Sequence, residues 1–371
     1  MADHDSIEPQ KAQEKRQCPL DSAIPDHLRT ERALPAKTPR DHQPPFPAYV
    51  ARFPRETAGI VMAVIGAQYG SESMVDEASQ AKLRSFVAGE SAPPVADWAS
   101  VVDDDGFYNV AVLAYWPSKE AHDDWAARSG FDAWWAGIEP GQYSHGWFLE
   151  RLHCPIDRLE TILSSCALAE GAANLRSSWS GQVRAHSYWG SMRDRLAAAQ
   201  TDRLEGEPSG DGGSGGRQRT SGRVRVPGRK NLAVIRSGQD WSDTRGEERE
   251  LYLKSIHPVL KAGMGFLSRD GHEVGCRSCR LMEIVKPETR KADTERTFGL
   301  AYFDDLASLE SWVKDHPTHH AIFGSFTRLA SKLQGDLALR LCHEVFVLNR
   351  EDQEFVYIDC HPGTGMMGKC T

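Results

Sequence analysis

The chain has 371 residues, of which 40% are hydrophobic and 26% are charged, and its formal net charge is −8. This charge argues against a nucleic acid or an anionic membrane surface as the main partner, because both attract basic patches. Residues 58–67 form the longest nearly apolar run, which is half of the about 20 residues that a membrane helix needs. The acidic N-terminus does not resemble a secretory signal, and eight cysteines are too few for a disulfide framework. We therefore expect a cytoplasmic enzyme without a membrane segment.

Composition divides the chain into four parts. Residues 1–41 are polar and punctuated by proline, which predicts a flexible tail without a catalytic role. Order is expected from residue 42 onward, with an N-terminal half over 42–202 and a C-terminal half over 231–371. The Gly-rich and basic segment 203–230 between them predicts a loop.

The two halves show signs of an internal repeat. Ala114-Tyr115-Trp116 recurs 187 positions later as Ala301-Tyr302-Phe303, and a tryptophan follows each motif at the same distance. A second match aligns the apolar run 63–67 with 233–237, so that Ala67 is the repeat equivalent of Ser237. Two short matches of this kind favour a duplicated architecture.

The C-terminal half has the order of elements of a ferredoxin-like unit, β-α-β-β-α-β. The periodicity predicts a strand at 231–237, a helix at about 246–267, β-rich segments at 275–285 and 296–303, helices at 306–315 and 318–334, and a strand at 339–349. The N-terminal half fits less completely, because prolines and aspartates obscure the strand expected near 90–105. We predict an α+β fold of two ferredoxin-like halves, of the dimeric α/β-barrel type.

One histidine lies on the apolar face of a predicted helix. Counting from His319, apolar residues follow at +3, +4, +7, +10, +11 and +14, which is one helical face. His320 falls on another face and is expected in solvent. A buried histidine is most often an ordinary core residue. The alternative for His319 is an axial ligand to haem, which requires a neutral imidazole in an apolar pocket.

Two further polar residues are expected on inward faces of strands. Strand alternation groups His343 with apolar neighbours, so it is either a core residue or a proton donor and acceptor at a ligand pocket. Ser237 ends its strand on the same face as Ala233 and Ile235. Its hydroxyl either caps a turn or binds substrate.

Other patterns carry less chemistry. Cys276-x-x-Cys279 lacks a second ligand pair for zinc, and alternation predicts that the two thiols point to opposite faces. No Gly-x-Ser-x-Gly motif is present, which argues against one class of hydrolase. Trp134, Trp135 and Phe326 are open to two interpretations, the lining of an arylalkyl pocket or the filling of the core.

Several long and colinear motifs resemble the haem-containing aldoxime dehydratases, the family that includes phenylacetaldoxime dehydratase. Together they extend over about residues 42–366. They are Gln43-Pro44-Pro45-Phe46-Pro47, Tyr188-Trp189-Gly190-Ser191-Met192-Arg193-Asp194-Arg195, Ile235-Arg236-Ser237-Gly238-Gln239-Asp240-Trp241, Glu247-Glu248-Arg249 with Leu251-Tyr252-Leu253, His316-Pro317-Thr318-His319, His343-Glu344-Val345, and Cys360-His361-Pro362 with Thr364-Gly365-Met366.

The resemblance implies a b-type haem, active in its ferrous form, in the C-terminal half. The proximal ligand falls on His319, the distal histidine on His343 and the substrate-binding serine on Ser237. The distal arginine falls on Arg195, with Arg193 as the alternative. The implied reaction is the dehydration of aldoximes to nitriles, with a small-molecule aldoxime as the partner.

Two other protein classes are compatible with a haem on this fold: peroxidases of the dye-decolorising or chlorite-dismutase type, and non-catalytic haem-binding proteins. The sequence also leaves open whether the chain is a monomer or a homodimer, and which aldoxime it prefers.

Overall fold

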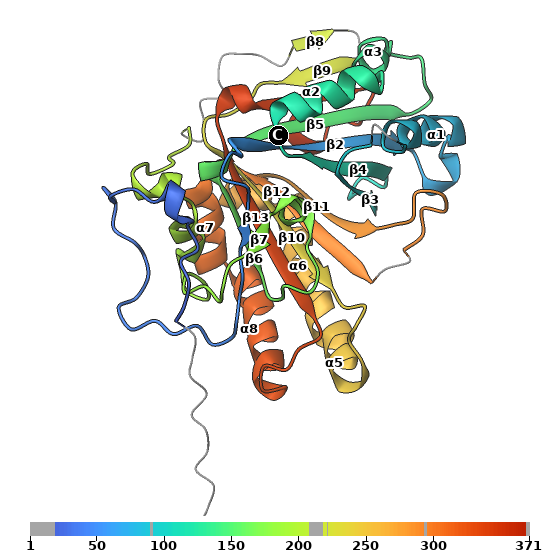
Figure 1. The fold of residues 1–371 in the computed structure, drawn as a ribbon. Helices are drawn as coiled ribbons and strands as arrows, with labels where there is room; N and C mark the ends of the chain where they lie inside the picture. Colours follow the sequence, from blue (N-terminus) through green and yellow to red (C-terminus); the bar gives the residue numbers. More distant parts are fainter. Residues whose placement is uncertain (1–18, 90–91, 208–217, 221, 293–294, 369–371) are drawn as a thin grey trace, which may run out of the picture.

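The computed structural model describes residues 19–89, 92–207, 218–220, 222–292 and 295–368 (Figure 1). The Gly-rich stretch 208–217 lies outside the described residues. The strands are β1 (Ala51–Arg52), β2 (Gly59–Tyr69), β3 (Val95–Val102), β4 (Tyr108–Trp116), β5 (Gly146–Pro155), β6 (Leu159–Leu163), β7 (Ser178–Trp179), β8 (Gln218–Thr220), β9 (Arg223–Val226), β10 (Leu232–Asp240), β11 (Cys276–Ile284), β12 (Arg296–Phe303), β13 (Arg340–Leu348) and β14 (Gln353–Ile358).

Eight α-helices lie between the strands in the described part of the chain. They are α1 (Glu77–Phe86), α2 (Lys119–Arg128), α3 (Phe131–Ala136), α4 (Ser191–Arg195), α5 (Gly246–Leu251), α6 (His257–Arg269), α7 (Leu306–Asp315) and α8 (Pro317–Lys332). A π-helical segment, η6 (Tyr252–Ile256), joins α5 to α6. None of the helices in the described part of the chain combines the length and the apolar character that crossing a bilayer requires.

Twelve strands form one curled antiparallel sheet in the order β6-β13-β10-β12-β11-β3-β4-β2-β5-β14-β9-β8. Strands β2 to β5 are neighbours within one part of this sheet, and β10 to β13 are neighbours within the other. Strand β6 follows β5 in the chain but pairs with β13, and β14 follows β13 but pairs with β5. Each half of the sheet is thus extended by a strand from the opposite half of the sequence, and β9 and β8 follow β14 at the far end.

Three apolar cores define the layers. One cluster fills the space between strands of the two halves and includes Met62, Tyr115, Val234 and Phe346. A second packs α1, α2 and α3 on β2, β4 and β5, and a third packs α6 and α7 on β10 to β13. Figure 1 shows the two helix groups on opposite sides of the sheet. Alternate residues of β10 and β13 therefore face either the inner core or the helices.

The described part of the predicted tail lies against the body of the protein. Asp21 forms a bridge with Val183, and the backbone N–H of Lys37 donates to the carboxylate of Asp194 at 2.9 Å. A short 3-10 helix, η1 (Asp26–Leu28), lies within this segment. Composition alone predicted flexibility here, but these tertiary hydrogen bonds hold residues 19–41 in place.

Pairing in the sheet corrects the second repeat match. Tyr115 pairs with Met62 as Tyr302 pairs with Val234, so the register aligns Ser237 with Ile65 and not with Ala67. A slip of two residues leaves every side chain on the same face, so the apolar pattern cannot detect it.

The cysteine pair also differs from expectation. A register shift between Cys276 and Ser278 turns both thiols into the helix-facing core, where each is buried. The predicted opposite faces are wrong because strict alternation fails at a bulge. No cluster of three or more metal-ligating side chains occurs among the residues that the structure describes.

Candidate active site

His319 lies in the first turn of α8. Pro317 occupies the first turn of the helix, where a missing N–H costs nothing, and the side chain of His316 accepts from the N–H of Thr318 at 3.3 Å. The ring of His319 lies edge-on to Trp312 with centroids 4.9 Å apart. His320 is exposed, as predicted.

The imidazole of His319 is neutral and has a free nitrogen. Burial lowers its pKa to about 4, and the backbone of Val313 opposes this shift only in part. Its Nδ1 is buried and makes no hydrogen bond within the described residues. A neutral imidazole in apolar surroundings is the state that binds a transition metal.

Ser237 and His343 lie directly opposite each other on neighbouring strands. Residue 237 of β10 pairs with residue 343 of β13 in the antiparallel register, so both side chains leave the same face of the sheet. That face carries Ile235 and Val345, which belong to the helix-facing core. The Oγ of Ser237 accepts a hydrogen bond from Nε2 of Gln239 at 3.2 Å.

The electrostatics of His343 connects it to two other predicted residues, His319 and Arg195. Burial, together with the charges of Arg195 and His319, lowers the pKa of His343 to about 4. No hydrogen bond from its ring to another described residue is present. The register thus places Ser237 and His343 side by side on the helix-facing side of the sheet, and His319 of α8 is close enough to affect the pKa of His343.

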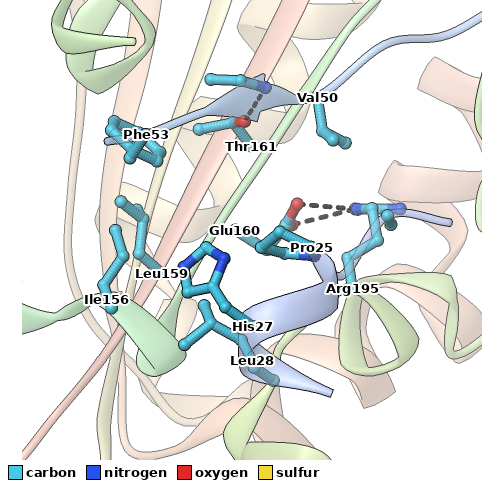
Figure 2. A pocket seen from close by; sticks show the side chains of 13 residues that line it. Pro25, His27, Leu28, Val50, Phe53, Ile156, Leu159, Glu160, Thr161 and Arg195 are labelled. Carbon is cyan, nitrogen blue, oxygen red and sulfur yellow. Dashed lines mark hydrogen bonds and ion pairs between the residues drawn. The ribbon is translucent and has the colours of Figure 1, made fainter. Parts of the chain in front are cut away.

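The two arginines of α4 have different surroundings. Arg195 is buried, and its Nε and one terminal nitrogen donate to the carboxylate of Glu160 at 2.7 and 2.9 Å (Figure 2). Arg193 instead pairs with Glu310 of α7 at 2.8 Å. Only Arg195 acts on the pKa of His343.

Glu160 is a site residue that the sequence analysis missed. It lies on β6 opposite Val345, two residues from the strand partner of His343, and is almost fully buried. Its two-point contact fixes the plane of the Arg195 guanidinium. A single acidic residue in the apolar segment 159–163 was the available signal.

A small cavity of about 40 Å³ adjoins this ion pair. Figure 2 shows Glu160 and Arg195 on one side, with Leu159, Ile156 and Phe53 on another and Pro25, His27 and Leu28 also lining it. The segment 19–41 therefore forms part of the wall around the predicted distal arginine.

His186 is a second residue that the sequence analysis did not single out. Its Nδ1 lies 2.9 Å from Oγ of Ser187, whereas its Nε2 is buried without a partner in the described residues. Burial and the neighbouring Arg195 lower its pKa to about 4. Phe46 contacts the His186 ring at 5.4 Å and the Phe326 ring at 5.6 Å. The Gln43–Pro47 motif is thus folded onto the surroundings of Arg195.

The depressed pKa of His186 predicts a pH-dependent stability of the haem-free chain. Between pH 6.5 and pH 4 the unfolded chain binds a proton at this residue that the native state does not, so stability falls as the pH is lowered through this window. We expect His186→Gln to reduce the loss of Tm between pH 7 and pH 5 relative to the unmodified chain. Replacement of the exposed His320 by Gln is the control, and an equal pH response in both variants would contradict the prediction.

The aromatic residues left open by the sequence separate into two places. Trp134 and Trp135 pack in the N-terminal helix-facing core with Phe131 and Trp147. Phe326 lies on α8, two turns beyond His319, against Phe46. The tryptophans therefore fill a core, and only Phe326 lies on the helix that carries the predicted ligand.

Residues 63–366 match the profile of the haem-containing dehydratases. The chain belongs to this family. It is 36% identical to an aliphatic aldoxime dehydratase of Pseudomonas chlororaphis, over 94% of this chain and 98% of that protein. It is 32% identical to a phenylacetaldoxime dehydratase of Bacillus sp. (strain OxB-1), over 89% of this chain and 93% of that one.

Solved structures show the same relationship. A crystal structure of an aldoxime dehydratase in complex with butyraldoxime superposes with a TM-score of 0.85 at 33% identity, over 94% of this chain and 96% of that one. The resemblance noted in the sequence is therefore confirmed at the level of family and fold. These matches favour the dehydratase interpretation over the peroxidase interpretation.

The residues of this member of the haem-containing dehydratases fit the cofactor of the family. His319 offers a neutral imidazole on an apolar helix face, with a buried nitrogen that has no protein partner in the described residues. His343 and Ser237 supply unionised polar groups from the facing sheet. A single neutral histidine with a free nitrogen is a donor that fits a haem held by one protein ligand.

Proposed function

We propose that this chain is an aldoxime dehydratase, a lyase that converts R–CH=NOH to R–C≡N and water, with a b-type haem held by His319. The observation that carries the proposal is a neutral histidine on α8 with an unpartnered Nδ1, close enough to His343 to affect its pKa, in a chain that belongs to the haem-containing dehydratases.

We further propose that the fold consists of two ferredoxin-like halves, with the haem in the C-terminal one. The strand orders β3-β4-β2-β5 and β11-β12-β10-β13 support this, because each is the 2-3-1-4 order of a ferredoxin-like unit. The helix-facing layer of the N-terminal half is packed with aromatic side chains, whereas the C-terminal half presents His319, His343 and Ser237 there.

The proposed chemistry divides between the cofactor and the chain. When bound, ferrous haem supplies a coordination position for the oxime nitrogen and electron density that weakens the N–O bond. The remaining task is to move one proton from the aldehydic carbon to the leaving oxygen, because hydroxide is a poor leaving group. We assign this proton to the imidazole of His343, which returns to its starting state after each turnover.

Two side chains complete the assignment. Ser237 holds the oxime hydroxyl by a hydrogen bond, which its position opposite His343 supports. Arg195 orients the hydroxyl and keeps His343 neutral at rest, and Glu160 keeps the guanidinium in place. Arg193 is set aside because it pairs with Glu310 of α7 and, unlike Arg195, is not among the charges that act on the pKa of His343.

The oxidation state of the haem-loaded protein tests the proposed function. We expect nitrile to form from butyraldoxime or phenylacetaldoxime under anaerobic conditions after dithionite reduction, with a shift of the Soret band on addition of substrate. The unreduced sample of the same preparation is the control and is expected to be inactive. Equal turnover without reductant, or peroxide-dependent dye oxidation in place of nitrile formation, would overturn the proposal.

A further inference from the structure

A buried polar network lies on the reverse face of the two strands that carry Ser237 and His343. Arg236 and Glu344 are direct partners in the sheet, one residue away from the Ser237–His343 pair. Because strand neighbours point to opposite faces, Arg236 and Glu344 project into the inner core while Ser237 and His343 face the helices. Both charged side chains are almost fully buried.

The N-terminal part of the chain supplies the partners of this network. The hydroxyl of Tyr115, on β4, donates to Oε1 of Glu344 at 2.5 Å, and the N–H of Ala172 donates to Oε2 at 2.7 Å. Arg236 pairs with Asp97 of β3 at 3.3 Å and with Glu170 at 3.4 Å. The strand positions directly beside the candidate site are thus held from the other half of the sequence.

The geometry around Glu344 leaves little freedom. Gly171 has a φ of +54°, and a Cβ at this position would lie 2.4 Å from Oε2 of Glu344. Burial raises the pKa of Glu344, while Arg236, Tyr115 and Ala172 favour its ionised form. Burying a carboxylate costs free energy unless its hydrogen bonds are kept. Loss of one donor should therefore shift the side chain of Glu344 and the strand that carries it.

We propose that Tyr115 is a positioning residue for the reaction, which acts through Glu344 by fixing β13 at His343 relative to β10 at Ser237. This inference rests on the proposed function. It extends the proposed machinery to the inner face of the sheet, since the hydroxyl of Tyr115 comes from β4 and bonds to Glu344 in the inner core.

The chain contains its own control for this proposal. Tyr302 occupies the position that the repeat matches to Tyr115, and its hydroxyl donates to Glu150 of β5 at 2.7 Å. Glu150 is also buried, with Tyr357 and Arg280 as further partners. The strand neighbour of Glu150 that matches His343 is Leu149, an apolar core residue. The two tyrosines make equivalent bonds, but only Tyr115 is connected to a strand that carries reactive groups.

The test compares Tyr115→Phe with Tyr302→Phe in the haem-loaded, reduced enzyme acting on butyraldoxime. Each variant removes one buried hydroxyl and leaves the ring in place. We expect kcat of Tyr115→Phe to fall about tenfold with KM changed by less than about twofold, because a small misplacement of a catalytic group lowers the rate more than it lowers binding. For Tyr302→Phe, we expect kcat to stay within about twofold of that of the unmodified enzyme. The Tm of Tyr302→Phe should fall as much as that of Tyr115→Phe, or more.

A second measurement separates positioning from a general loss of structure. If Tyr115 acts through His343, adding Tyr115→Phe to a His343→Ala background should cause no further loss of kcat. Equal losses of kcat in the two Tyr→Phe variants, or a further tenfold loss in the His343→Ala background, would overturn the inference. Absence of nitrile formation by the unmodified reduced enzyme would instead overturn the proposed function.

Discussion

Replacing His319 with alanine is expected to remove haem and dehydratase activity together. The imidazole of His319 is the neutral ring that α8 offers to the haem, with a buried Nδ1 that has no partner in the described residues, so its loss leaves the iron without a protein ligand. Mutation of outer-shell partners costs about 10–100-fold in metal affinity, and loss of the ligand itself should cost more. The measurement is the Soret absorbance per mole of purified chain from cells supplied with haem.

The neighbouring histidine provides the matched control for this prediction. His320 is exposed and bonded to the backbone of Lys314, so His320→Ala should retain haem and turnover. His319→Gly should recover part of the Soret band when free imidazole is added, because the vacated space accepts the missing ligand. Full haem occupancy and full activity in His319→Ala would refute the ligand assignment.

Replacing His343 with alanine is expected to abolish most turnover while leaving haem in place. The imidazole carries the proton between carbon and oxygen in the proposed reaction, and general acid–base catalysis of this kind contributes about 10²–10⁴-fold. We expect kcat to fall within that range and the aldoxime-induced Soret shift to persist, because substrate binding does not require the imidazole.

Ser237→Ala is the companion variant on the opposite strand. Its hydroxyl only holds the substrate, so we expect a smaller fall in kcat than for His343→Ala and a rise in KM. A larger loss for Ser237→Ala than for His343→Ala would reverse the proposed roles. Loss of haem from His343→Ala would show that this residue belongs to the cofactor-binding side instead.

The buried network around Glu344 links the N-terminal part of the chain to the strand that carries His343. The helix-facing layer of the N-terminal part is filled by aromatic side chains such as Trp125 and Trp147. On the inner face of this part, however, the hydroxyl of Tyr115 donates a hydrogen bond to Glu344, the residue next to His343 on β13. Under the proposal for Tyr115, a residue of the inner core therefore affects the reaction by fixing the backbone beside His343.

Local patterns in the sequence were sufficient for the elements of the C-terminal part and for the orientation of three site residues. Helical spacing placed His319 on the apolar face of α8, and strand alternation placed His343 and Ser237 on an apolar strand face, which the structure shows to be the helix-facing one. The family motifs added Arg195. They could not distinguish it from Arg193 with certainty, because both lie on one short helix.

The tertiary structure decided the features that depend on contacts between distant residues. The pairing of Glu160 with Arg195, the fold of residues 19–41 onto the body and the shared face of Cys276 and Cys279 all arise from such contacts or from a local bulge. Strand register likewise aligned Ser237 with Ile65, because a slip of two residues preserves every pattern that the sequence displays. Periodicity thus fixes which face a side chain occupies, whereas the partner across that face is set only when the sheet assembles.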